Sequence, residues 1–429
     1  MELSRTRKHL DTLVLFHCWP YVPPIIDPEQ HVGLLGDAVD RHPTGHLPFP
    51  VFRLPRGEFD LAEICERNNL PKVTNLFLCL DATVPYEPRN LKAHCENVFL
   101  ILGDSHHLPS PISRLRSYLM KEKFDGVIFT NNARHRRWFA DLLNVSRIYF
   151  EPGIFSVEPS KVGAIISQGR RDDREFQPAP PIIYGQLGPF HPRRCRLAPT
   201  LIDKGLLRHI SGPWEELRDA MSNALASVNI TLNADLNSRV FEVAETGCPL
   251  VIDKLGAENG FGTVLIPEYN SLVFNTNAEL EAILSDWSYL HTVRNTVGKR
   301  LQADYKRYWS PAAIRNKYLT NISNPWEAFK TDFPRKKSVN DELPGIFSLR
   351  LKIYEDLQEL HRQYESIDLV TNENFIQGFE SEVDCLPRIR VCHLSQARLS
   401  DDSVLTITAQ FDDAASCFKL FRIESPQLH

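Results

Sequence analysis

The sequence predicts an α/β protein with two domains, each a parallel β-sheet covered by helices, and a C-terminal helix-plus-hairpin extension. Three observations predict this fold class. Apolar runs of strand length alternate with amphipathic segments in both halves of the chain. A charged and proline-rich stretch at residues 157–181 separates the halves, as a solvated linker would. The chain of 429 residues is also too long for one typical domain.

The composition is that of an ordinary globular protein. The formal net charge of −5 argues against nucleic acid as a main partner. No apolar run is long enough to span a membrane, and the N-terminus lacks the apolar core of a signal peptide. The nine cysteines are scattered without a C-x-x-C pair, which is typical of a reduced chain without a zinc site or disulfides. We therefore expect a soluble, cytoplasmic protein that binds no metal.

The first half predicts strands that alternate with helices of about ten residues, which is typical of a parallel sheet. Residues 27–57 contain many Pro, Gly and His and are expected to form loops. A basic cluster at residues 134–137 is expected to be the solvated face of a helix; the alternative is a patch that contacts an anionic acceptor or a membrane surface. The strands are expected at 12–18, 73–80, 97–102, 126–130 and 147–150, and the helices at 60–69, 113–123 and 133–143.

The sequence Gly-Asp-Ser-His-His at residues 103–107 is the strongest catalytic candidate of this half. It directly follows an apolar strand, so Asp104, His106 and His107 are expected at the carboxyl edge of the sheet. One histidine would serve as a general base for a hydroxyl, and Asp104 would orient its ring. The alternatives are helix capping with exposed histidines, and a metal site with three ligands and no clear fourth.

The second half predicts another alternation of strands and helices. A loop with Gly185 and Gly188 follows its first strand, and Arg193 and Arg194 are expected just before a helix. Such a loop suits a diphosphate. The alternative is that both arginines are simply exposed to solvent. The strands are expected at 182–184, 207–210, 224–232 and 249–252, and the helices at 197–203, 215–226, 239–246, 277–289 and 290–308.

The central feature is the segment 233–253, which predicts a loop, a short helix and a strand. Asn237 and Ser238 can cap the helix start, and Gly247 stands where a helix would end. Arg239 lies in the first turn, with Glu242 on the same face. A helix N-terminus with an arginine suits a diphosphate, and the carboxylate suits ribose hydroxyls. The alternative is an Arg239–Glu242 surface pair on an ordinary helix.

The run LNSRVFEVAETGCPLVID resembles the donor-site segment of GT-B glycosyltransferases, especially the spore-maturation-protein type of family-1-like domains. The matching residues are Asn237, Arg239, Phe241, Glu242 and Gly247, and Glu245 stands where that family often has a small residue. The resemblance covers residues 181–319 well and the first half only loosely.

The resemblance implies a metal-independent glycosyltransferase of polysaccharide biosynthesis. Two Rossmann-like domains would face a cleft: one would present a glycan or another hydroxyl acceptor, and the other would bind a nucleotide sugar as substrate, with no separate cofactor. The expected parts are an acceptor domain (1–156), a linker (157–181), a nucleotide-sugar domain (182–308), a crossover helix (309–324) and an extension (325–429).

One position departs from the resembled pattern. Ala234 stands where many retaining enzymes carry a first glutamate, so inverting and retaining chemistry both stay open. A nucleoside-monophosphate donor also stays open. The alternative functions are a catalytically inactive GT-B scaffold in a polysaccharide-assembly complex, and a sugar-nucleotide epimerase. In the extension, an amphipathic helix is expected at 346–367 and a β-hairpin at 404–411 and 417–423.

Overall fold

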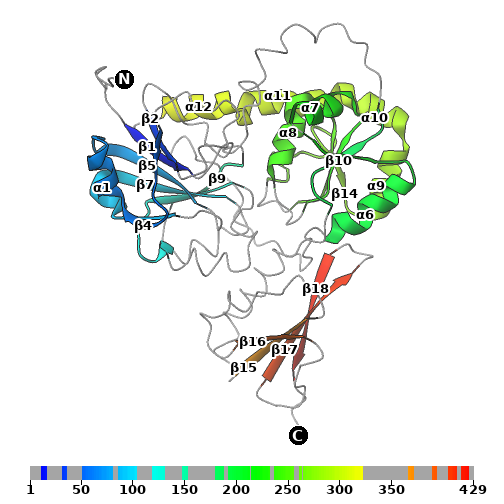
Figure 1. Ribbon diagram of the computed structural model, residues 1–429. Coiled ribbons are helices and arrows are strands. Elements are labelled where there is room, and N and C mark those ends of the chain that lie inside the picture. The colour runs from blue at the N-terminus through cyan, green and yellow to red at the C-terminus, as the bar shows by residue number, and fades with distance from the viewer. Residues whose placement is uncertain are drawn as a thin grey trace. The chain divides into compact units, whose positions relative to one another are not determined.

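The structure is a computed structural model in which two compact units can be distinguished. Unit 1 comprises Met1–Ser105, Leu115–Glu175 and Asp304–Phe333, and unit 2 comprises His106–Arg114, Phe176–Ala303 and Pro334–His429. Figure 1 labels the elements of both units. The structure describes residues 11–16, 31–35, 51–80, 86–103, 118–130, 147–152, 179–187, 192–212, 214–231, 236–255, 260–262, 264–321, 366–371, 389–393, 404–412 and 417–424.

Unit 1 contains a seven-stranded parallel sheet of order β3-β2-β1-β5-β7-β8-β9. The central strands are mostly apolar and most of their residues are buried, as is typical of strands covered on both faces. The strands are β1 (Thr12–Phe16), β2 (His31–Leu35), β3 (Val51–Arg53), β5 (Val73–Leu80), β7 (Cys95–Leu102), β8 (Gly126–Phe129) and β9 (Ile148–Phe150).

Strands β2 and β3 correct the prediction that residues 27–57 form loops only. Both strands are short and flanked by proline, glycine or histidine, so the local sequence resembles a loop. Their pairing with β1 and with each other supplies the hydrogen bonds that the local sequence does not indicate.

Short elements flank the large sheet. Helix α1 (Leu61–Arg67) begins where predicted, because the Asp60 carboxylate accepts from the Ala62 N–H at 2.8 Å. Strands β4 (Gly57–Asp60) and β6 (Tyr86–Arg89) form a separate parallel pair, and α2 (Leu91–His94) precedes β7.

Helix α12 (Pro311–Thr320) packs within unit 1, although it follows unit 2 in the sequence. Tyr318 is fully buried, forms a hydrogen bond with Thr12 and meets the Phe77 ring edge-on at 5.3 Å. Lys317 forms an ion pair with the buried Glu151. This helix lies in the range predicted for the crossover helix.

Unit 2 contains a five-stranded parallel sheet of order β11-β10-β12-β13-β14. The chain passes from β10 to β11 on one side and then returns to β12 on the other side of β10. The two parallel sheets with their helices confirm the predicted α/β fold class. The strands are β10 (Ile182–Tyr184), β11 (Arg208–Ile210), β12 (Ser227–Asn229), β13 (Leu250–Asp253) and β14 (Leu272–Phe274).

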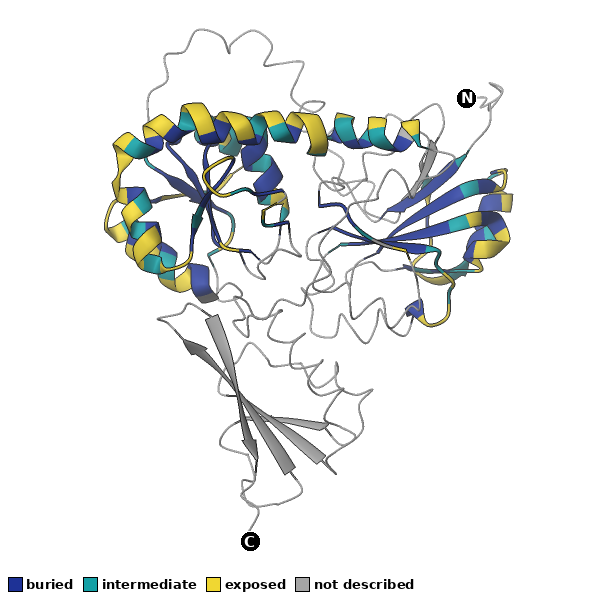
Figure 2. Ribbon diagram, turned by 180° about the vertical axis from the view of Figure 1, so that it is seen from behind, coloured by how far each residue is buried: buried dark blue, intermediate teal, exposed yellow. Residues whose placement is uncertain are grey.

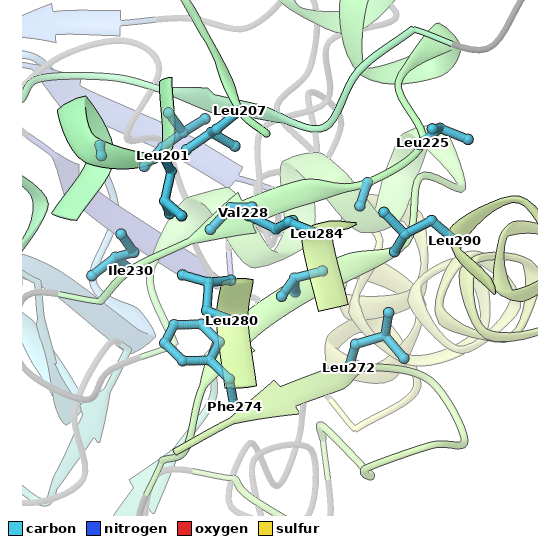
Figure 3. Packing of buried hydrophobic residues seen from close by; sticks show 14 of the residues in the cluster. Leu201, Leu207, Leu225, Val228, Ile230, Leu272, Phe274, Leu280, Leu284 and Leu290 are labelled. Carbon is cyan, nitrogen blue, oxygen red and sulfur yellow. The ribbon is translucent and has the colours of Figure 1, made fainter. Parts of the chain in front are cut away.

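The helices of unit 2 bury one face each and expose the other, as Figure 2 shows. One face of the sheet carries an apolar core that includes Val228, Phe274 and Leu280 (Figure 3). Helix α8 packs against β12, β13 and α7. The helices are α6 (Pro192–Asp203), α7 (Trp214–Asn223), α8 (Ser238–Thr246), α9 (Asn277–Ser285), α10 (Trp287–Val293) and α11 (Lys299–Asp304), with π-helical turns η3 (Arg294–Gly298) and η4 (Tyr305–Trp309).

A four-stranded sheet of order β16-β15-β17-β18 lies near the C-terminus. The antiparallel pair β17 (Val404–Asp412) and β18 (Cys417–Glu424) confirms the predicted hairpin. Strand β15 (Ser366–Thr371) places Ile367 in a strand, so the predicted helix cannot extend to that residue; residues 346–365 lie outside the described part. Strand β16 (Ile389–His393) had no predicted counterpart.

In the ranges that the structure describes, no helix combines the length and the apolar character that crossing a membrane requires.

Candidate functional site at the carboxyl edge of the unit 2 sheet

The order of the unit 2 strands marks a position for ligand binding. Strands β10 and β12 are neighbours, but the chain leaves β10 toward β11 on the opposite side. The connections after β10 and β12 therefore diverge at the carboxyl edge of the sheet. Ligands of open α/β sheets bind at such a topological switch point. Here β10 ends at Tyr184 and is followed by Gly185, and β12 ends at Asn229 and is followed by the connection to α8.

Helix α8 begins at this edge, directly after Asn237. Asn237 occupies the N-cap position with extended backbone, but its side chain accepts no hydrogen bond from the helix. Its amide oxygen instead accepts from the Asn229 Nδ2 atom at 3.1 Å. The predicted capping by Asn237 is therefore wrong, because Asn229 holds its side chain. The first-turn N–H groups of a helix suit an anion.

Tyr184, Arg239 and Glu242 form one contact group, named here the Tyr184 cluster. The Tyr184 hydroxyl donates to Glu242 Oε2 at 2.6 Å, and the guanidinium carbon of Arg239 lies 5.5 Å from the centre of the Tyr184 ring. Tyr184 is 5% exposed, whereas Arg239 and Glu242 are half-buried. Within the described residues no ion pair joins Arg239 to Glu242, which excludes the alternative of a simple surface pair.

Burial dominates the electrostatics of Glu242. It raises the pKa of the carboxyl group, while the Tyr184 hydrogen bond, the Arg239 charge and a Ser238 hydrogen bond act in the opposite direction. Burial and the neighbouring carboxylate raise the pKa of Tyr184 well above its usual value. Tyr184 is therefore a neutral donor, and Glu242 accepts its hydroxyl hydrogen bond.

Gly185 leaves room for Arg239. Its φ of +89° lies in the left-handed region that favours glycine, and a Cβ atom at this position would collide with Arg239 Nη2. The Gly185 carbonyl oxygen lies 2.9 Å from His209 Nε2. Gly185 thus lies beside the Tyr184 cluster, and its role in binding a diphosphate stays a prediction. Gly188 lies outside the described residues.

Arg193 and Arg194 lie inside α6, which begins at Pro192, and not before a helix as expected. Both are buried. Arg193 Nη1 donates to Asp253 Oδ2 at 2.7 Å, and Arg194 Nε donates to the Ile230 carbonyl oxygen. Both arginines therefore have protein partners, and their contact with a diphosphate stays a prediction.

The catalytic candidates of the first half cannot be placed in the same way. Asp104, His106 and His107 lie outside the described residues; β7, which precedes them in the sequence, ends at Leu102. Among the residues that are described, no group of three or more His, Cys, Asp or Glu side chains could hold a metal ion.

Sequence reasoning missed Tyr184, Asn229 and Asp253. Each is the last residue of a strand in the unit 2 sheet. Tyr184 and Asp253 hydrogen-bond to residues 58 and 60 positions away, and Asn229 hydrogen-bonds to Asn237, eight positions away. A polar residue at the end of an apolar strand was the available signal, because parallel strands bring their carboxyl ends to one edge.

Comparison with protein families finds a match that includes Arg239 and Glu242 but not Tyr184. Residues 193–320 match the family model described as glycosyl transferase-like, and this segment contains α6 to α12. The match confirms the predicted resemblance to glycosyltransferases for that segment, and the likeness to the spore-maturation-protein type stays a prediction. A sequence comparison with curated proteins finds no significant match.

Comparison with solved structures finds distant similarity. Sucrose-phosphate synthase from Thermosynechococcus elongatus shares 13% identity over 72% of this chain and 98% of its own, with a TM-score of 0.44. HepE from Anabaena, in complex with UDP-glucose, shares 13% sequence identity over 73% of this chain and 100% of its own, with a TM-score of 0.42. The T4 phage β-glucosyltransferase shares 11% sequence identity over 75% of this chain and 100% of its own, with a TM-score of 0.41.

Proposed function

We propose that this protein transfers a sugar from a nucleotide-sugar donor to a hydroxyl group of a glycan or another acceptor. The observation that carries the proposal is the Tyr184 cluster beside the start of α8, at the switch point of a parallel sheet. A half-buried guanidinium, the start of a helix and a half-buried carboxylate are groups that suit a nucleoside diphosphate.

The donor would bind with its diphosphate at the start of α8. Ser238 and Arg239 supply the first backbone amides, and the Arg239 guanidinium adds a positive charge. Glu242 would accept hydrogen bonds from the ribose hydroxyls. As the bond between sugar and diphosphate breaks, negative charge grows on the leaving group, and donors already in place stabilise it. The charge on Arg239 therefore serves the transition state more than the bound donor.

A panel of nucleotides tests this proposal directly. Thermal unfolding of the full chain is measured with UDP, GDP, CMP and their sugar conjugates. One nucleotide is expected to stabilise the protein by about 2.7 kcal/mol at a concentration about 100 times its dissociation constant. Release of free nucleotide that depends on an acceptor would identify a transferase, whereas conversion of the sugar without an acceptor would identify an epimerase. A chain that binds none of them would be a scaffold.

The acceptor hydroxyl needs a base, and we assign this role to His106 or His107, oriented by Asp104. Replacing the essential histidine by alanine is expected to lower turnover by about 10²-fold or more, because a positioned base contributes at least that factor. The nucleotide should bind the variant as tightly as the native chain. Turnover measured by nucleotide release, with each single variant, checks this; native rates in both would remove the assignment.

A further inference from the structure

Tyr184 is a buried aromatic side chain beneath two charged ones. It ends β10 at the carboxyl edge, where its ring and hydroxyl lie against Arg239 and Glu242 of α8. Arg239 and Glu242 keep part of their surface exposed, whereas Tyr184 is almost completely covered. A buried tyrosine has little rotamer freedom in a packed interior, so it can fix the position of the groups it contacts.

The two contacts use different parts of the tyrosine. The hydroxyl lies 2.6 Å from Glu242 Oε2 and 3.4 Å from the Arg239 carbonyl oxygen, so its single proton goes to the carboxylate. The ring face attracts the Arg239 guanidinium and needs no hydroxyl. Substitution can therefore separate the two contacts.

The remaining acceptor capacity of Glu242 matches a ribose. An ionised carboxylate offers about four acceptor positions. The Tyr184 hydroxyl uses one of them, which leaves acceptor positions for a pair of neighbouring hydroxyls. A carboxylate that is already oriented loses less side-chain entropy when a ligand binds.

We propose that Tyr184 is a positioning residue for the nucleotide donor: its hydroxyl orients Glu242 for the ribose hydroxyls, and its ring orients Arg239 for the diphosphate. This inference rests on the proposed function. Tyr184 does not contact the donor; it acts through both of the residues that do.

The test measures equilibrium binding to the full chain by calorimetry. The probes are UDP, GDP and CMP, each beside its 2′,3′-dideoxy analogue, and inorganic pyrophosphate. In Tyr184→Phe, affinity for the nucleotide that the native chain binds is expected to fall about tenfold, which is the effect of one hydrogen bond to a charged group. Affinity for its dideoxy analogue and for pyrophosphate should change less than about twofold, because the ring remains.

In Tyr184→Leu the ring is lost as well. Affinity for pyrophosphate is then expected to fall about fivefold, as a cation–π contact of this kind would give. Tyr289→Phe is the matched control, because its hydroxyl donates to Glu268 at 3.1 Å on the surface of the same unit. This control should bind every probe like the native chain.

The outcomes separate the inference from the function on which it rests. If the native chain binds none of the probes, the proposed function fails, and the positioning role fails with it. In a second outcome, Glu242→Ala weakens nucleotide binding, but the ratio of the affinities for the nucleotide and its dideoxy analogue is the same in Tyr184→Phe as in the native chain. The proposed function then stands and the positioning role is wrong. Equal losses of affinity for all probes in Tyr184→Phe would also overturn the positioning role, because they would indicate a general structural defect.

Discussion

Arg239→Ala is expected to lower kcat/KM for the nucleotide-sugar donor by about 10³-fold. Loss of one preorganised group that stabilises transition-state charge costs roughly 10²–10³ in kcat, and a charge-assisted contact with the bound donor adds about tenfold in affinity. The fold should persist, because Arg239 is half-buried and its recorded contact is with the Tyr184 ring. Initial rates of nucleotide release over a range of donor concentrations would separate kcat from KM.

Arg300→Ala is the matched control for this prediction. The Arg300 guanidinium carbon also lies over a tyrosine ring, 5.1 Å from the centre of Tyr269. Arg300 belongs to α11. Gln302 of the same helix donates a hydrogen bond to the Glu245 carbonyl oxygen, which lies near the C-terminal end of α8. Removal of the Arg300 side chain should leave kcat/KM within about twofold of the native value. Native kinetics in Arg239→Ala would show that the diphosphate lies elsewhere.

Asp253→Ala is expected to destabilise unit 2 by about 3–5 kcal/mol, the range seen when one partner of a buried ion pair is removed. Asp253 is 3% exposed and accepts from Arg193 Nη1 at 2.7 Å, from the Thr231 N–H at 2.9 Å and from the Thr231 hydroxyl at 2.7 Å. Alanine would leave a buried guanidinium without its carboxylate. Urea denaturation followed by circular dichroism measures the loss.

Two control variants show whether the loss of stability in Asp253→Ala comes from the buried ion pair. Lys204 and Glu281 form an exposed pair in the same unit, so Lys204→Ala should cost less than about 1 kcal/mol. The double variant Arg193→Met with Asp253→Leu should regain part of the stability, because it removes both charges together but still leaves the buried Thr231 N–H without its acceptor. If the double variant also binds nucleotide normally, Arg193 is structural; a large loss of affinity would restore it as a phosphate contact.

Much of unit 2 could be predicted from local sequence. Strands β10 and β13 and helix α8 lie within about a residue of their expected ranges. Gly247 ends α8 with φ of +74°, a conformation that glycine adopts without strain. Such signals depend on neighbours in the chain, so they can be read without knowing the fold. Strands β2 and β3 were missed because their pairing partners, and not their own residues, make them strands.

By itself, the amino-acid sequence determined the alternation of strand and helix and the start of α8. It also determined that a cation and a carboxylate lie on one face of that helix. Only the tertiary structure decided which of the charged side chains are buried and which keep part of their surface exposed. It put β10 beside β12, which brought Tyr184 to Glu242 across 58 positions, and it placed Asp253 against Arg193 across 60. Contacts between residues so far apart depend on strand order, and strand order arises from packing of the whole sheet.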